Sequence, residues 1–190
     1  MTVKSRILMF VASILLLSTF LFPIWNIDLH APQYPEGIGL RIWINQITGL
    51  NEFDLHNINK LNHYIGMKEI QPDAIKELKI MPYIIIGFVL LGLLITLLKR
   101  KKLVVVWLVL LLITLGVGLY DFYLWEYDYG HNLNPNAAIK VPGMVYQPPL
   151  IGSKKLLNMN AVSLPGIGGI FIGISVVLSS LAIYYDRKNK

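Results

Sequence analysis

The stretch IIIGFVLLGLLITLLKRKKLVVVWLVLLLITLGVGLY, residues 84–120, decides the fold. It covers most of one apolar run, residues 80–98, and all of another, residues 103–120, joined by the cations KRKK at residues 99–102. Crossing the hydrocarbon core of a bilayer takes about 20 apolar residues, because a helix rises about 1.5 Å per residue over a core of roughly 30 Å. The pattern therefore predicts two transmembrane helices joined by a short basic turn.

Two further apolar runs have a similar length, at residues 7–24 and 167–185. The basic start MTVKSR is typical of a signal peptide, but the following STFLFPIW has no small-x-small cleavage site, so we interpret the first run as an uncleaved span. Only 15% of the residues are charged, against roughly 25% in soluble domains. The predicted fold class is an all-α integral membrane protein with four transmembrane helices, forming a single membrane domain over residues 1–190.

Lys and Arg are distributed unevenly around the four predicted spans. Nine of the 17 cations, but only one of the 11 acids, lie at the two termini and in the 99–102 turn. Cytoplasmic loops of membrane proteins carry the excess of Lys and Arg. Both termini and this turn are therefore predicted to be cytoplasmic, in a bacterial inner membrane. Two long segments, residues 25–79 and 121–166, then face outward, and we expect them to form a partly helical cap.

Composition argues against several classes of function. The net charge of +6 lies beside the apolar runs rather than on a water-exposed surface, so no binding to nucleic acid is expected. The absence of cysteine excludes disulfides and thiolate metal centres. The four spans contain no Asp, Glu, Lys, Arg or His, whereas pumps and secondary transporters normally need such residues inside the membrane.

The outer stretch NINKLNHYIGMKEI, residues 57–70, carries the first candidate site. On a helix His63 and Met67 would share a face, and imidazole with thioether suits copper, particularly Cu(I). His56 precedes His63 by two helical turns and is a further candidate ligand. Two other interpretations stay open: Asn62 and His63 bond to loop backbone while Met67 fills a packing gap, or the stretch is a surface that a partner recognises.

The stretch EYDYGHNLNPN, residues 126–136, is the second candidate site. Glu126, Asp128 and His131 could bind a cation, although Asp, Gly and Asn are also ordinary turn formers. The outer segments show no recognised nucleophile–base arrangement and no phosphate-binding loop. An enzyme acting on its own is therefore not the favoured interpretation.

Three segments, APQYPEGIGLRIW, NINKLNHYIGM and WEYDYGHNLNPNAAI, resemble a family of small four-span membrane proteins encoded beside second-clade nitrous-oxide reductases and in related copper-enzyme clusters. The resemblance implies a non-catalytic membrane partner, or an assembly or anchoring subunit, of an extracytoplasmic copper enzyme, working in a hetero-complex and handling copper. It transfers no catalytic residue. The alternative is a membrane subunit of a redox complex, with a quinol- or lipid-binding pocket at the outer leaflet near Trp25, Tyr120 and Trp125.

Overall fold

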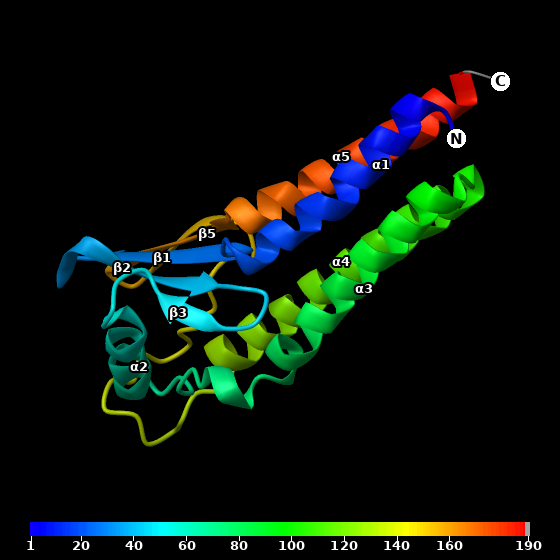
Figure 1. The fold of residues 1–190 in the computed structure, drawn as a ribbon. Helices are drawn as coiled ribbons and strands as arrows, with labels where there is room; N and C mark the ends of the chain where they lie inside the picture. The colour runs from blue at the N-terminus through cyan, green and yellow to red at the C-terminus, as the bar shows by residue number, and fades with distance from the viewer. Residues whose placement is uncertain (189–190) are drawn as a thin grey trace.

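The computed structural model describes residues 1–188, and within that range four helices are long and apolar enough to cross a membrane. They lie together at one end of the molecule, and a five-stranded sheet lies at the other (Figure 1). These candidate spans are Val3–Phe20, Lys76–Leu98, Lys101–His131 and Ile167–Arg187. Each of the four predicted apolar runs overlaps one of them.

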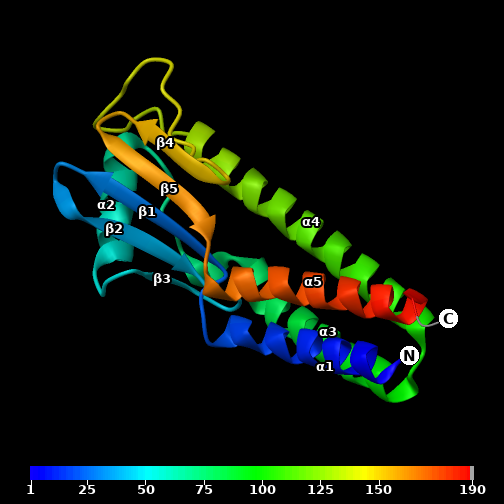
Figure 2. The same cartoon turned by 90° about the horizontal axis from the view of Figure 1, so that it is seen from above.

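The bundle consists of α1, the 3-10 helix η1, α3, α4 and α5, with bounds Val3–Leu15, Leu16–Phe20, Lys76–Leu98, Lys101–His131 and Ile167–Lys188. The first span packs mainly against α5 and next against α3. At the contact with α3, a Cβ on Gly92 would overlap the Ser13 side chain, so glycine allows the two helices to approach closely. The chain start, the end of α5 and the α3–α4 turn lie at the same end of the bundle (Figure 2).

The sheet overturns the predicted all-α fold class, because the two segments expected to be partly helical loops contribute strands. The described residues are 58% helix and 17% strand, so the fold is mixed α/β. All neighbouring strands are antiparallel, in the order β3-β2-β1-β5-β4. Their bounds are Trp25–Ala31 (β1), Tyr34–Ile42 (β2), Ile47–Gly49 (β3), Gly152–Leu156 (β4) and Met159–Pro165 (β5).

Alternation with a period of two explains why residues 25–31 form a strand. Ile27 and Ala31 are buried on one face, whereas His30 on the other face is exposed. The decisive partner is distant in sequence, since β1 pairs with β5 in a register that places Ile27 opposite Ser163. The sheet thus joins both long segments, and we call residues 25–75 and 132–166 the cap.

The cap is fastened to the bundle where the chain enters and leaves the sheet. The N–H groups of Gly166 and Gly168 donate to the carbonyls of Ile24 and Pro23, at 3.0 and 2.9 Å. A Cβ on either glycine would lie closer than 3.0 Å to backbone in the segment before β1. The stretch LPGIGG therefore serves as a close backbone junction between the cap and the first turn of α5.

Helix α4 is longer than a membrane crossing requires. Its 31 residues span about 46 Å, against a hydrocarbon core of roughly 30 Å. The uncharged part ends at Tyr120, and residues 121–131, which we call the α4 extension, carry three acids. Phe122, Trp125 and Tyr129 of this extension pack against the apolar core of the cap. We therefore treat residues 101–120 as the membrane-spanning part of α4, and the extension as the part beyond the membrane that packs on the cap.

Candidate functional site

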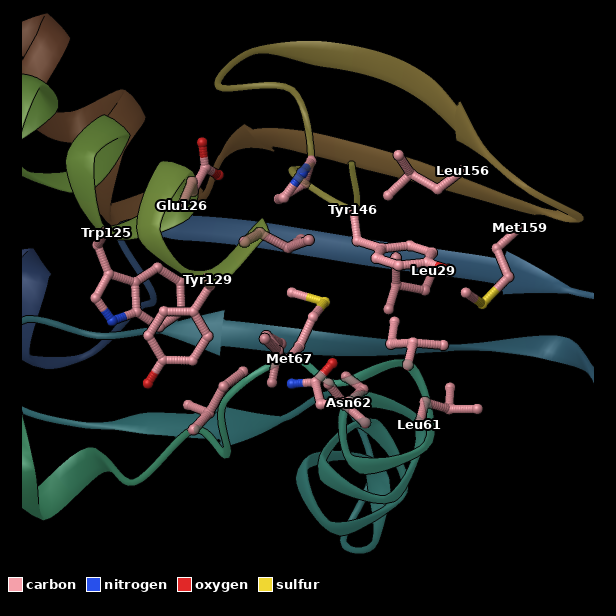
Figure 3. Close-up of a pocket in the computed structure, with 16 residues that line it drawn as sticks. Leu29, Leu61, Asn62, Met67, Trp125, Glu126, Tyr129, Tyr146, Leu156 and Met159 are labelled. Atoms are coloured by element: carbon pink, nitrogen blue, oxygen red, sulfur yellow. The ribbon is translucent and has the colours of Figure 1, made fainter. Parts of the chain in front are cut away.

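The helix on which His63 and Met67 were predicted to share a face ends before Met67. Helix α2 runs from Asp54 to Ile65, and Gly66 follows with φ of 82°, a left-handed conformation that favours glycine. His63 is exposed, whereas Met67 turns inward and lines a cavity (Figure 3). The two side chains therefore lie in different surroundings, and copper binding by them stays a prediction.

The other predicted ligands are also apart from Met67. His56 is exposed on α2, two turns before His63. At the end of α4, the His131 ring stacks on Tyr127 with centroids 3.8 Å apart, and its Nδ1 lies 3.0 Å from the Tyr127 carbonyl oxygen. Within residues 1–188, no group of three or more His, Asp or Glu side chains is arranged to hold a metal ion.

The asparagines of NINKLN fasten the segment that follows α2. The side chain of Asn59 makes two hydrogen bonds with the backbone of Ile70, accepting from its N–H at 2.8 Å and donating to its carbonyl at 3.0 Å. Asn62 is buried and donates to the Lys68 carbonyl at 3.3 Å. The contact of Asn62 with loop backbone is the kind that the structural interpretation of the stretch expects, whereas Met67 lines the cavity.

One side of α2 faces solvent and is rich in aromatic and basic groups. We call it the docking face, after the role proposed below. Its members are Phe53, directly before the helix, and His56, Lys60, His63 and Tyr64. Phe53 is 64% exposed, and Tyr64 near the end of α2 is 53% exposed. The opposite side of α2 packs on β2 and β3. Figure 1 places α2 at the end of the molecule away from the two termini.

Both ends of α2 are held by buried or backbone contacts. At the start, the buried Asp54 carboxylate accepts from the N–H groups of Gly39 and Asn51, at 3.0 and 3.1 Å. At the end, the Ile139 N–H donates to the Tyr64 carbonyl at 2.9 Å, and the Ile139 side chain is 49% exposed. The docking face is therefore fixed on β2 and extended by an apolar residue from the 132–142 loop.

A cavity of about 70 Å³ lies between the sheet, α2 and the α4 extension (Figure 3). Its lining is almost entirely apolar or aromatic and includes Leu29, Met67, Tyr146, Leu156 and Met159. An engineered apolar cavity of about 150 Å³ binds benzene, so this one has room for a few carbon atoms.

Two buried polar side chains at this cavity have no hydrogen-bond partner among the described residues. Glu126 is fully buried with both carboxyl oxygens unpaired, and the Tyr146 hydroxyl is unpaired as well. In Figure 3 the Glu126 carboxyl group points away from Met67. Burial raises the pKa of Glu126 to about 8, because the charged form loses solvation, so the neutral acid is favoured at pH 7.

A row of aromatic rings runs from the start of β1 to this cavity. Neighbouring ring centroids are 5.6 Å apart for Trp25 and Phe122, 6.2 Å for Phe122 and Trp125, and 4.3 Å for Trp125 and Tyr129. Trp125 and Tyr129 line the cavity. Of the three residues predicted for a quinol or lipid pocket, Trp25 and Trp125 belong to this row, whereas Tyr120 is 64% exposed and does not line the cavity.

Two residues of the second predicted cation site, Glu126 and Asp128, do not share a face of α4, because they are two positions apart on the helix. Glu126 is buried, while Asp128 is on the surface and pairs with Lys68. The hydrogen bond from Lys68 is the main cause that lowers the pKa of Asp128. The sequence interpretation named Trp125 for an outer pocket but not Tyr129, which stands four residues later on the same helical face and also lines the cavity.

Comparison with known proteins assigns neither a family nor a fold. No protein-family model, curated protein or solved structure matches this chain.

Proposed function

We propose that this chain is a non-catalytic membrane subunit that holds an extracytoplasmic protein on its cap, through the docking face of α2. The observation that carries the proposal is the docking face itself, which exposes Phe53 and Tyr64 on a helix whose other side is firmly packed. Large aromatic residues are enriched among the side chains that dominate protein interfaces. Phe53 and Tyr64 lie at the two ends of one side of α2, and a partner that covered this side would remove both rings from water.

The attachment of the cap supports this role. The sheet is joined to the bundle through backbone hydrogen bonds, and Asp54 fixes the start of α2 to β2. A surface that is already ordered loses less conformational entropy when it binds. An anchored partner would therefore be held at a defined height and orientation relative to the bundle.

The chemistry of the docking face indicates what the partner offers. His56, Lys60 and His63 lie between the two aromatic rings, so a complementary surface would place carboxylates opposite them and apolar groups opposite Phe53 and Tyr64. The resemblance of the NINKLNHYIGM segment implies that this partner is a copper enzyme such as nitrous-oxide reductase. In this proposal the termini are cytoplasmic in a bacterial cell, and the exposed imidazoles shape the contact or present copper to the partner.

The test is co-purification from native membranes of the full chain and the double variant Phe53→Ala/Tyr64→Ala. We expect one copper protein, identified by mass spectrometry with the wild type, to be lost at least about tenfold from the variant, because interface aromatics often contribute more than 1 kcal/mol each. The matched control is Ile151→Ala/Leu164→Ala, whose side chains are 60% and 47% exposed elsewhere on the chain. Equal recovery from both double variants would contradict the proposal.

A second candidate function is binding of a lipid or quinol at the outer leaflet, along the aromatic row from Trp25 to Tyr129. The cavity is too small for the whole molecule, so only a carbonyl group or a few carbon atoms of it would enter. The unpaired Tyr146 hydroxyl offers a hydrogen-bond donor to a carbonyl oxygen in otherwise apolar surroundings. The test is extraction of the purified protein, followed by mass spectrometry of lipids and quinones. We expect a bound molecule with the wild type and a reduced amount with Tyr146→Phe. Equal amounts with both proteins would refute this candidate.

A further inference from the structure

A second, larger concavity lies at the end of the bundle that carries the N-terminus and the α3–α4 turn. It measures about 650 Å³ and is walled by Met1, Thr2, the turn residues 99–102, Leu103 and Asp186. We call it the basic pocket. Helix α2 lies at the opposite end of the molecule from the chain start and the α3–α4 turn (Figures 1 and 2).

The charges on the walls of the basic pocket are strongly one-sided. Four consecutive cations, Lys99, Arg100, Lys101 and Lys102, surround it together with the amino group of Met1. Among the described residues that form its walls, the acid is Asp186, which is only 6% exposed. The pocket therefore presents mainly positive charge to any group that enters it.

The buried acid is already committed to the start of α1. One carboxylate oxygen of Asp186 accepts from the Thr2 N–H at 2.6 Å, and the other accepts from the Ser5 hydroxyl at 2.9 Å. These hydrogen bonds compensate the acid within the protein. Asp186 thus joins α5 to α1, and its single negative charge is outnumbered by the positive charges of the turn.

The turn that presents the cations has a defined shape. Lys99 has φ of 57°, in the left-handed region where glycine is normally found at the end of a helix. Its carbonyl accepts from the Met1 amino group at 3.2 Å, which ties the chain start to the turn. The left-handed conformation of Lys99 and its contact with the N-terminus hold the turn in one shape, so its cations have a defined arrangement.

We propose that the basic pocket binds a phosphate-bearing anionic group, supplied by the headgroup of a phospholipid. Arg100 can bond two phosphate oxygens at once, and the lysines add compact charges. Basic pockets between transmembrane helices on the cytoplasmic side are suited to anionic headgroups. With the termini in the cytoplasm, as proposed above, the pocket lies at the surface of the inner leaflet.

The neighbouring side chains favour a lipid over free phosphate as the source of that group. Directly before the turn, Leu97 is 71% exposed and Leu98 is 50% exposed, and Val3 beside the chain start is 70% exposed. A headgroup in the basic pocket would leave its acyl chains beside this apolar surface. A free phosphate ion would gain nothing from it.

The experiment measures lipid retention by the full chain in a neutral detergent, using native mass spectrometry. The probes are phosphatidylglycerol, phosphatidylcholine and inorganic phosphate, each added separately. We expect the wild type to retain phosphatidylglycerol and Arg100→Gln/Lys102→Gln to retain it at least about tenfold less. The matched control Lys154→Gln/Lys155→Gln, which removes the same charge from exposed β4 residues, should retain it as the wild type does.

A charge-conserving variant separates loss of the site from loss of folding. Arg100→Lys/Lys102→Arg keeps the charge and should keep most of the binding, with the same helical circular dichroism as the wild type. The proposed site is wrong if both glutamine variants lose phosphatidylglycerol equally, or if the wild type retains phosphatidylcholine as well as it retains phosphatidylglycerol. Retention of inorganic phosphate without phosphatidylglycerol would overturn the lipid assignment. Partner recovery should stay unchanged in Arg100→Gln/Lys102→Gln, so failure here is distinguishable from failure of the docking proposal.

Discussion

Replacing Gly130 with alanine should separate the α4 extension from the cap, and the same helix provides its own controls. A Cβ on Gly130 would lie closer than 3.0 Å to the backbone nitrogen and Cα of Gln147. The neighbouring Tyr146 N–H donates to the Gly130 carbonyl at 3.1 Å. The backbone around residue 147 cannot yield as a flexible side chain would, so this segment must shift away from α4.

The expected magnitude follows from three opposing contributions. Alanine in a helix normally stabilises by about 0.5–1 kcal/mol relative to glycine. Overpacking against backbone costs about 1–3 kcal/mol, and a lost hydrogen bond costs about 1 kcal/mol. Gly130→Ala should therefore lower the free energy of unfolding by about 1–3 kcal/mol. For a protein of this size, that corresponds to a fall of roughly 2–10 °C in Tm.

The assay is thermal unfolding of the purified protein in one detergent, followed by tryptophan fluorescence. Gly116→Ala and Gly118→Ala serve as controls, because apart from chain neighbours and the nearby helix backbone no atom lies within 4 Å of the Cβ that either would add. We expect these two to melt at or slightly above the wild-type temperature. A Gly130→Ala protein that melts with the controls would refute the close packing of the 144–148 segment on α4.

Two other substitutions test the buried acid and the glycine turn. The wild type should lose stability as pH rises from about 4.5 to 8, because folded Glu126, with its pKa raised to about 8, binds more protons there than the unfolded chain. Glu126→Gln should reduce the difference between the unfolding free energies at pH 5 and pH 8 by an amount on the order of 3 kcal/mol. Glu36→Gln, which changes an exposed residue, should leave this difference unchanged. Equal pH dependence in the wild type and both variants would count against the burial of Glu126. Gly66→Ala, at φ of 82°, should cost about 1–3 kcal/mol in chemical denaturation, and a cost near zero would contradict the left-handed turn.

The sequence predicts the helices well because their signals are local. An apolar run such as residues 80–98 is visible within 20 residues, and Lys76–Leu98 is the helix that contains it. The end of α4 was placed too early, since the change in polarity after Tyr120 marks the end of the apolar run and not the end of the helix. Aromatic residues of the α4 extension continue the helix by packing on the cap.

The sheet was missed because its pairing is not local. Trp25 lies opposite Pro165 across most of the chain, and no short window of sequence contains both strands. In the candidate site, helical spacing placed His56 and His63 on one side of α2, and both are exposed there. The same spacing failed for Met67, because Gly66 ends the helix, and a glycine after a periodic run is itself a known stop signal.

The central claim, that the docking face holds an extracytoplasmic protein, is tested most directly by photo-crosslinking in native membranes. A photoreactive amino acid is placed at position 53 or 64 of the docking face, or at position 151 as the control, and products are identified by mass spectrometry. Our account predicts that positions 53 and 64 capture the same copper protein and that position 151 does not. Absence of that protein from the products at positions 53 and 64, or its capture at position 151 alone, would contradict the account.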